Sequence, residues 1–402
     1  MIDLKHTVKY AIVIPDGAAD EPIAELHGLT PLEAADTTNL DWLAVNGRCG
    51  TVSLTPPRQP LAMEAAMAAM LGCDPQENSV AAGPLMAAGL HLPTDPTDWI
   101  FLCSLVTIVD GVLIDPLGGG ISTREASRLI DLLNKEFGAA EFRFICGQDW
   151  RHLMVTGREI SVRTFPPHSF VGESVANAAP RGRDSRQIND ILRAAHELFA
   201  DHEINAVRRD LGESPVTDIW LWGAGQTKPL PDFREQFGLT VAAVATDPLV
   251  CGLAGRMGWK VVDVRCQDGY TTADLDEMAA AAVALLDDCD LVCVHTACAD
   301  RAGLAGDPAA KVASIEAIDR QIVGPILRRL RDEPDGWRML VAPTHATLCG
   351  SRQRIGGPVP FAVSGLGVEA LIRQPYTERI AEESDLHIAR GHQLMEYFLT
   401  VR

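Results

Sequence analysis

The sequence predicts an α/β fold with a mostly parallel sheet that is covered by helices on both faces. Short apolar runs alternate with longer amphipathic stretches, and the first run, at residues 10–14, stops at Pro15, Asp16 and Gly17. A short β-branched run that ends at a proline and a glycine is typical of a buried parallel strand followed by a loop. Because such runs alternate with helices, crossover connections place helices on both faces of the sheet.

Each element follows from the same pattern. The expected strands share a short apolar core, and they lie at residues 10–14, 241–245, 260–264, 291–294 and 338–341. The expected helices carry apolar residues at helical spacing, and they lie at residues 40–45, 273–286 and 309–330. Asn39 directly precedes the first of these helices. It is therefore a predicted N-cap, whose side-chain oxygen accepts a hydrogen bond from a free backbone amide of the helix.

Two segments rich in glycine and proline, residues 115–120 and 212–215, are predicted hinges. Between them we expect helices at 123–137 and 184–200 and strands at 142–146 and 153–156. This set is enough for a small α+β module. The predicted organisation is therefore an α/β core formed by residues 1–116 and 217–402, with an inserted α+β cap domain at 117–216.

Composition limits the classes of partner. The 402 residues include 47% hydrophobic and 22% charged residues, and the formal net charge of −19 argues against nucleic acid or an anionic membrane. No signal-peptide pattern and no run of about 18 apolar residues is present, so we expect a cytoplasmic protein. The ten cysteines form no CxxC pair, which favours reduced thiols over a zinc site. A small anionic metabolite stays possible, because a few arginines can reverse the field locally.

Chemistry is expected beyond the carboxyl ends of the strands. Asp16, Asp300 and His345 each follow one of the predicted strands, and together they could converge on a divalent metal. Each of them alone is more often an aspartate that caps a turn or a histidine at the surface.

Several stretches carry the motifs of a known family, in order along the whole chain: residues 12–20, 29–41, 71–75, 311–319, 357–361 and 391–395. With them the chain resembles the cofactor-independent phosphoglycerate mutases of the archaeal type, in the alkaline phosphatase superfamily. The resemblance implies an alkaline-phosphatase-like three-layer core and two divalent metals such as Mn, Mg or Zn. It also implies a serine that carries the phosphoryl group during interconversion of 3-phosphoglycerate and 2-phosphoglycerate.

The sequence departs from this pattern at the site. Met63 stands where the family has its nucleophilic serine, and a thioether has no proton to lose. Of the family's metal ligands, Asp16, Asp300 and His345 are retained. The other ligand positions hold Leu304, Thr344 and Arg354. The resemblance therefore implies a vestigial metal site at which binding is weak or lost.

Substrate positions of the family have also changed. Its Gly-Arg-Gly-Pro run reads Ala81 to Pro84, its Arg-x-Asn run reads 102–104, and a histidine is replaced by Gly120. Four arginines could still hold an anion: Arg208, Arg256, Arg352 and Arg354. The guanidinium of Arg354 could replace metal charge in gripping an anion, whereas the alternative is that these arginines make local surface salt bridges.

Three functional hypotheses follow. The first is a mutase homologue without phosphoserine chemistry, which acts as a ligand sensor or as a partner subunit in a hetero- or homo-oligomer. The second is an enzyme of different chemistry on an anion-binding cleft whose metal centre is either remodelled or absent. The third is a working mutase, but no serine or threonine lies between Thr55 and Ser79 to take the place of Met63. The repeated methionines Met63, Met67 and Met70 predict an apolar helix face.

Overall fold

The structure, a computed structural model, describes residues 8–56, 60–138, 141–264 and 275–400, and it divides the chain into two compact units. The larger unit is Met1–Ser79 with Pro229–Arg402, and the smaller unit is Val80–Lys228. The inserted domain predicted at 117–216 is thus only part of the smaller unit. Residues before 117 join it because β3 (Trp99–Val109) pairs with two later strands of that unit.

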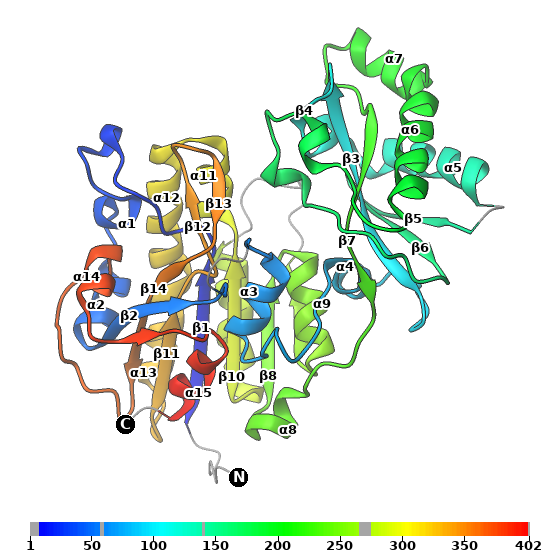
Figure 1. The fold of residues 1–402 in the computed structure, drawn as a ribbon. Coiled ribbons are helices and arrows are strands. Elements are labelled where there is room, and N and C mark those ends of the chain that lie inside the picture. Colours follow the sequence, from blue (N-terminus) through cyan, green and yellow to red (C-terminus); the bar gives the residue numbers. More distant parts are fainter. Residues whose placement is uncertain (1–7, 57–59, 139–140, 265–274, 401–402) are drawn as a thin grey trace. The chain divides into compact units, whose positions relative to one another are not determined.

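The larger unit is built on an eight-stranded sheet in the order β15-β2-β14-β11-β1-β10-β8-β9 (Figure 1). Its strands are β1 (Lys9–Pro15), β2 (Gly47–Ser53), β8 (Val241–Ala245), β9 (Lys260–Asp263), β10 (Leu291–Thr296), β11 (Trp337–Val341), β14 (Pro358–Gly365) and β15 (His387–Ile388). The run from β11 to β9 is parallel, and β14 pairs antiparallel with both β11 and β2. The predicted α/β class with a mostly parallel sheet is confirmed.

Helices pack on the sheet through alternate strand residues. One group comprises α2 (Thr38–Val45), α10 (Leu275–Asp288), α12 (Pro308–Ile318) and α13 (Gly324–Arg331). Val13 of β1 belongs to the apolar cluster that these helices bury. Another group comprises α3 (Met63–Met70), α9 (Pro248–Arg256) and α15 (Gln393–Thr400). Tyr10, on the alternate side of β1, meets Phe398 of α15 edge to face at 5.6 Å. Residues 273–274 of one predicted helix lie outside the described residues.

One predicted cap is wrong. Helix α2 follows Thr37, so Asn39 lies inside the helix rather than before it. The amides at the start of α2 are instead bound by Asp319, which accepts the Leu40 N–H at 2.7 Å and the Asn39 N–H at 3.1 Å. Asp319 opens a π-helical turn, Asp319–Val323, between α12 and α13. A carboxylate that is distant in sequence therefore caps the start of α2 in place of a neighbouring residue.

A buried lysine holds the loop after β1. Lys311 on α12 is fully buried, and its ammonium donates to the carbonyls of Ala19 (3.0 Å) and Thr347 (2.7 Å) and to the Asp20 carboxylate (2.8 Å). All three ammonium protons have acceptors, as burial of such a charge requires. Lys311 thus fixes two loops that end at the carboxyl edge of the sheet.

Glu378 extends this buried cluster. It begins α14 (Glu378–Glu383), and its carboxyl group accepts the Asp20 N–H at 3.0 Å and the Thr30 hydroxyl at 2.7 Å. Burial raises the pKa of Glu378 to about 7, although these hydrogen bonds and the charge of Lys311 oppose the shift. Glu378 is therefore an acid that titrates near neutrality in the folded chain.

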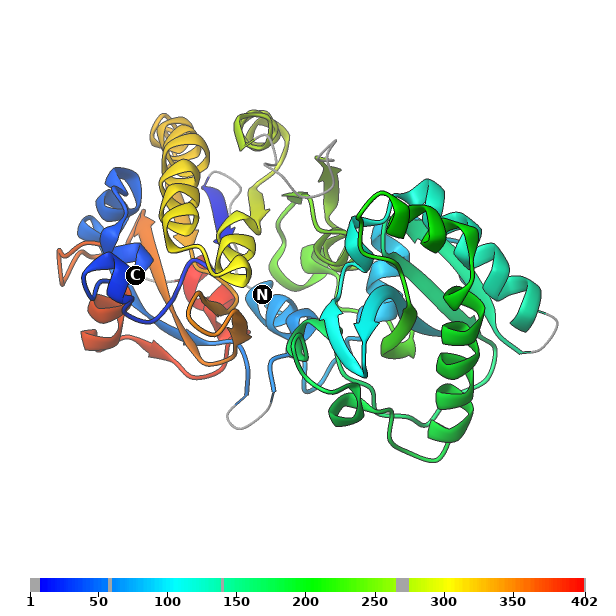
Figure 2. The same cartoon turned by 90° about the horizontal axis from the view of Figure 1, so that it is seen from above.

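The smaller unit is built on a five-stranded antiparallel sheet in which β3 pairs with three other strands. These elements are β4 (Val112–Asp115), β5 (Arg143–Gln148), β6 (Arg151–Thr156), β7 (Asp218–Gln226), α4 (Ala82–Gly89), α5 (Thr123–Phe137), α6 (Ser185–Ala200) and α7 (Glu203–Asp210). Helices α5 and α6 lie side by side (Figures 1 and 2), α5 on β5 and α6 on β7. The helices and strands predicted for the α+β module are present.

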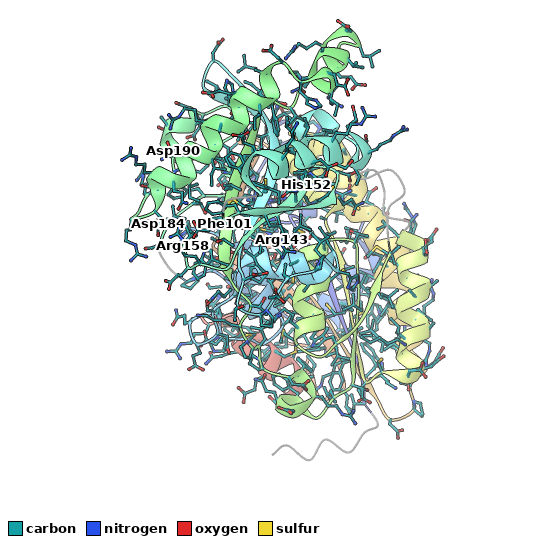
Figure 3. The ribbon with its side chains drawn as sticks, turned by 90° about the vertical axis from the view of Figure 1, so that its right-hand side faces the viewer. Phe101, Arg143, His152, Arg158, Asp184 and Asp190 are labelled. Carbon is teal, nitrogen blue, oxygen red and sulfur yellow. The ribbon has the colours of Figure 1, made fainter. Side chains whose placement is uncertain are left out.

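The predicted hinges lie inside this unit and are structured. Asp115 accepts the amides of Leu117 at 2.7 Å and Gly119 at 2.8 Å, so the glycine run is a closed turn. Deeper in the unit, His152 is fully buried, and burial lowers its pKa to about 3, which makes it a neutral core residue. At the surface Arg158 pairs with Asp184 at 3.5 Å (Figure 3).

Among the described residues, no helix has the length and hydropathy that a membrane span requires.

Replacing Asp319 tests the long-range cap. The substitution Asp319→Ala leaves the two amides of α2 without their acceptor, while the Asn39 side chain keeps only the Asp319 carbonyl, so we expect the free energy of unfolding to fall by about 2 kcal/mol. Asp319→Asn keeps one acceptor oxygen and should lower the free energy of unfolding by about half as much. Urea unfolding followed by circular dichroism measures both. A loss below about 0.5 kcal/mol for Asp319→Ala would contradict the capping role.

Glu378 should make stability depend on pH. Its folded-state pKa of about 7 exceeds its ordinary value of 4.5, so the unfolded chain loses this proton first as pH rises. The free energy of unfolding should therefore fall between about pH 4.5 and 7, by about 1 to 3 kcal/mol from this group, and level off above. The difference in urea midpoint between the parent and Glu378→Gln, measured from pH 5 to 8, isolates this contribution. A difference that does not change with pH would refute it.

Candidate functional site

Three residues that the sequence analysis singled out lie at the carboxyl edge of the larger unit's sheet. Asp16 follows β1, His345 follows β11, and Asp300 lies in the first turn of α11 (Cys298–Ala305), after β10. These strands are neighbours in the order β11, β1, β10, and parallel neighbours end at the same edge. All three side chains are buried, and hydrogen bonds join them into one cluster.

Asp16 accepts hydrogen bonds on both carboxylate oxygens. Its Oδ1 accepts the amide of Thr344 at 2.7 Å and the hydroxyl of the same residue at 2.6 Å, and its Oδ2 lies 2.8 Å from His295 Nε2. Burial alone would raise the pKa of Asp16, but the charges of His345 and His295 and these hydrogen bonds lower it overall. The carboxylate charge in turn raises the pKa of His295 against the effect of burial. Asp16 is thus a paired carboxylate.

Asp300 is held by a guanidinium. Arg354, on β13 (Gln353–Ile355), places Nε 2.9 Å from Oδ1 and Nη2 2.6 Å from Oδ2, a bidentate geometry. The Asp300 Oδ1 also accepts the Thr347 hydroxyl at 2.6 Å. Burial raises the pKa of Asp300, but Arg354 and His345 outweigh it and hold the pKa well below its usual range. Asp300 is therefore ionised and paired at neutral pH.

His345 joins the two carboxylates. Its Nδ1 lies 3.0 Å from the Thr344 hydroxyl, and its Nε2 lies 3.1 Å from Asp300 Oδ1. The Thr344 hydroxyl gives its single proton to Asp16, so the imidazole must donate at Nδ1, and Asp300 is an acceptor at Nε2. Both nitrogens of His345 are therefore in hydrogen bonds within the cluster.

A further carboxylate completes the cluster. Asp247 follows β8 and caps α9, where it accepts the Leu249 amide at 2.8 Å. Its charge raises the pKa of both His295 and Arg354. We call the whole set the ion-pair network; its acidic members are Asp16, Asp247 and Asp300, and its basic members are His295, His345 and Arg354.

This arrangement does not fit a bound divalent metal. Both oxygens of Asp16 and of Asp300 accept hydrogen bonds from the protein, and both nitrogens of His345 are in hydrogen bonds. Within residues 8–56, 60–138, 141–264 and 275–400, no group of three or more His, Cys, Asp and Glu is arranged to hold a metal ion. A metal would have to displace the guanidinium of Arg354 to reach Asp300.

Met63 is the first residue of α3 and is half-buried, whereas Met67 and Met70 on the same helix are buried. The predicted apolar helix face is therefore present. Glu64 beside it is half-buried, and burial raises its pKa. Neither Met63 nor its neighbour Ala62 carries a hydroxyl or a thiol, so these two positions offer no serine-like nucleophile.

The arginines predicted to bind an anion have different surroundings. Arg208 is buried in the smaller unit, where it donates to the carbonyls of Gly119 at 2.6 Å and Ser214 at 2.9 Å and pairs with Glu125 at 3.2 Å. Arg352 is exposed on the turn between β12 (Ala346–Leu348) and β13. Arg256 is half-buried at the end of α9, and burial lowers its pKa. The structure brings Arg354 to the ion-pair network, and an anion-binding role for the four arginines stays a prediction.

Some members of the network were not predicted. His295 is the next-to-last residue of β10, and Asp247 lies two residues after the end of β8. The rule that located Asp16 and Asp300, that polar residues gather where parallel strands end, would also have located these two. Thr347 gave no such signal, because a threonine in a loop is ordinary, and Thr344 was singled out only because the resemblance places a metal ligand at its position.

Comparisons with known proteins extend these observations. Residues 44–205 match the family described as 2,3-bisphosphoglycerate-independent phosphoglycerate mutase. The chain is 36% identical to the protein of that name, numbered 2, from Methanothermobacter thermautotrophicus, with 98% of both chains covered. It is 31% identical to the one from Methanothrix thermoacetophila, over 98% of this chain and 100% of the relative.

Two solved structures agree with this. The PH0037 protein from Pyrococcus horikoshii matches with a TM-score of 0.78 and 27% identity, over 98% of this chain and 97% of the other. The cofactor-independent phosphoglycerate mutase from Thermoplasma acidophilum matches with a TM-score of 0.58 and 25% identity, over 98% and 99%. Sequence identity above 30% along nearly the full length, together with the predicted motifs, shows that this chain belongs to the archaeal-type family of 2,3-bisphosphoglycerate-independent phosphoglycerate mutases.

Proposed function

We propose that this chain is a member of the family that does not transfer phosphoryl groups through a phosphoserine, and that it acts by binding, as a ligand-responsive protein or a partner subunit. The observation that carries the proposal is the bidentate pair between Arg354 and Asp300, with Nη2 and Oδ2 2.6 Å apart. A guanidinium in this position neutralises the carboxylate that a metal would need.

The missing nucleophile supports the same conclusion. Phosphoryl transfer through the enzyme needs an oxygen or nitrogen nucleophile, and a metal normally lowers the pKa of a serine for this purpose. The family resemblance puts the serine at the position of Met63, which begins α3 in this chain. Because a thioether has no proton to lose and forms no stable phosphoryl ester, the position of Met63 offers no acceptor for the covalent step.

The charge of the ion-pair network also argues against a phosphate substrate. A phosphate monoester near neutrality carries about two negative charges and needs a surplus of positive groups. Here the three basic members of the network face three carboxylates, those of Asp16, Asp247 and Asp300, and two nitrogens of Arg354 are bound to Asp300. A phosphate-sized anion would therefore meet carboxylates at this edge of the sheet.

One observation favours the alternative, an enzyme of different chemistry on an anion-binding cleft. None of the hydrogen bonds within the described part of the chain uses Nη1 of Arg354, and 20% of this side chain is exposed. A guanidinium held on one edge by a carboxylate can offer its other edge to a ligand carboxylate. This suits a small monoanion better than a phosphate ester.

The proposal is tested by assaying conversion of 3-phosphoglycerate to 2-phosphoglycerate with Mn²⁺, Co²⁺ or Mg²⁺ supplied in turn, on protein shown to be folded by circular dichroism. We expect no turnover above the blank, while the Methanothermobacter thermautotrophicus relative assayed in parallel tests the assay itself. The variant Met63→Ser should also be inactive, because a hydroxyl alone does not replace the metals.

Metal-dependent turnover by the parent chain would overturn the proposal. To distinguish genuine activity from a contaminant, the same preparation is made from Asp300→Asn, which changes the charge of Asp300 but not its size. Activity that disappears in this variant belongs to the chain, whereas activity that persists at the same level comes from a contaminant and leaves the proposal standing.

A further inference from the structure

The two oxygens of Asp300 have different partners, and the difference bears on what Arg354 does. Oδ1 accepts from Thr347, His345 and Arg354, whereas within the described residues Oδ2 accepts only from Arg354, through Nη2 at 2.6 Å and Nε at 3.2 Å. Without the guanidinium, Oδ2 would be a buried anionic oxygen with no donor. Such an atom strongly favours any cation that can reach it.

The surrounding charges also favour a cation at the position of the Arg354 guanidinium. Asp16 and Asp247 act on Arg354 through their charges, and both of them favour its cationic form. If Arg354 is removed, three carboxylates remain with only the two imidazoles of His295 and His345. The network then carries a net negative charge at a buried site, and a divalent cation is the species that best restores the balance.

We propose that the Arg354 guanidinium is a resident cation that fills the place of a metal, and that removing it opens a divalent-cation site at Asp300 and His345, with Asp247 beside it. This inference rests on the proposed function, because both hold that the parent chain keeps metals out.

The ligand set of this latent site follows from the contacts. The freed Asp300 carboxylate supplies oxygen, and His345 Nε2, already 3.1 Å from Asp300 Oδ1, supplies nitrogen once it releases its proton on coordination. Mixed carboxylate and imidazole ligands suit Mn²⁺ and Zn²⁺. With two direct protein ligands and water completing the shell, binding should be weaker than at a structural site with four protein ligands.

The experiment compares the full-length parent with a matched series at one position. Arg354→Ala removes both the charge and the bulk, Arg354→Met removes the charge but keeps much of the bulk, and Arg354→Lys keeps the charge. Each protein is equilibrated with Mn²⁺ or Zn²⁺, freed of unbound metal on a desalting column, and analysed for metal content. Thermal unfolding with and without 1 mM metal is measured in parallel.

We expect about one metal ion per Arg354→Ala chain and a rise in Tm of about 3 to 6 °C with metal. The parent and Arg354→Lys should hold no metal above background and show no rise, because the site already contains a positive charge. Arg354→Met should bind at least about tenfold less metal than Arg354→Ala, since its side chain fills the space. The double variant Arg354→Ala with Asp300→Asn should lose the binding.

Two results would overturn the inference. One is stoichiometric metal in the parent chain, because the guanidinium would then be no barrier. The other is folded Arg354→Ala that binds no metal, because the carboxylates would then tolerate the loss of their counter-charge. If Arg354→Ala does not fold alone, it is refolded with and without Zn²⁺. Recovery only with Zn²⁺ supports the inference, and no recovery in either case contradicts it.

Failure of the inference can be separated from failure of the proposed function. Turnover by the parent with added metal would overturn both of them. A parent chain without metal and without turnover, alongside an Arg354→Ala variant that also binds none, would overturn this inference alone. Metal content and Tm report on the site whether or not any chemistry takes place there.

Discussion

The buried carboxylates at the carboxyl edge of the larger unit's sheet need counter-charge, and in this chain protein side chains supply it. An ionised carboxyl group removed from water is stable only when it is paired and its oxygens accept hydrogen bonds. Arg354 meets this requirement for Asp300, and His345 connects Asp300 to Asp16 through Thr344. The loops that follow β1, β10 and β11 are therefore fixed to one another by charge.

This network continues into a second buried polar cluster through one residue. The Thr347 hydroxyl donates to Asp300 at 2.6 Å, and its carbonyl accepts from the Lys311 ammonium at 2.7 Å. Lys311 in turn pairs with Asp20, whose amide donates to Glu378. Within the described residues, the carboxylates of these clusters have protein partners, whereas His295 Nδ1 is buried without one and the hydrogen bonds of Arg354 use only Nε and Nη2.

Membership in a family of phosphoglycerate mutases does not by itself assign that activity to this chain. The fold, the order of the motifs and nearly the whole length agree with the relatives. The function of such a fold depends on particular side chains, and a fold can persist while its site changes. Here Met63 and Arg354 stand at positions where the resemblance implies a serine and a metal ligand. The two changes are chemically consistent, because activating the nucleophile is one of the roles that a metal plays in such a site.

The sequence by itself determined the local elements and the family, and the resemblance placed Met63 at the position expected for a serine. Apolar periodicity is a local property, so it gave β1, β8, β10 and β11 nearly as the structure has them. It could not show that Asp319 would cap α2 from 280 positions away, or that β3 would pair within the smaller unit. Nor could it show that Arg354 would point at Asp300, with His295 and Asp247 nearby. Those facts depend on which distant segments become neighbours, and only tertiary packing decides that.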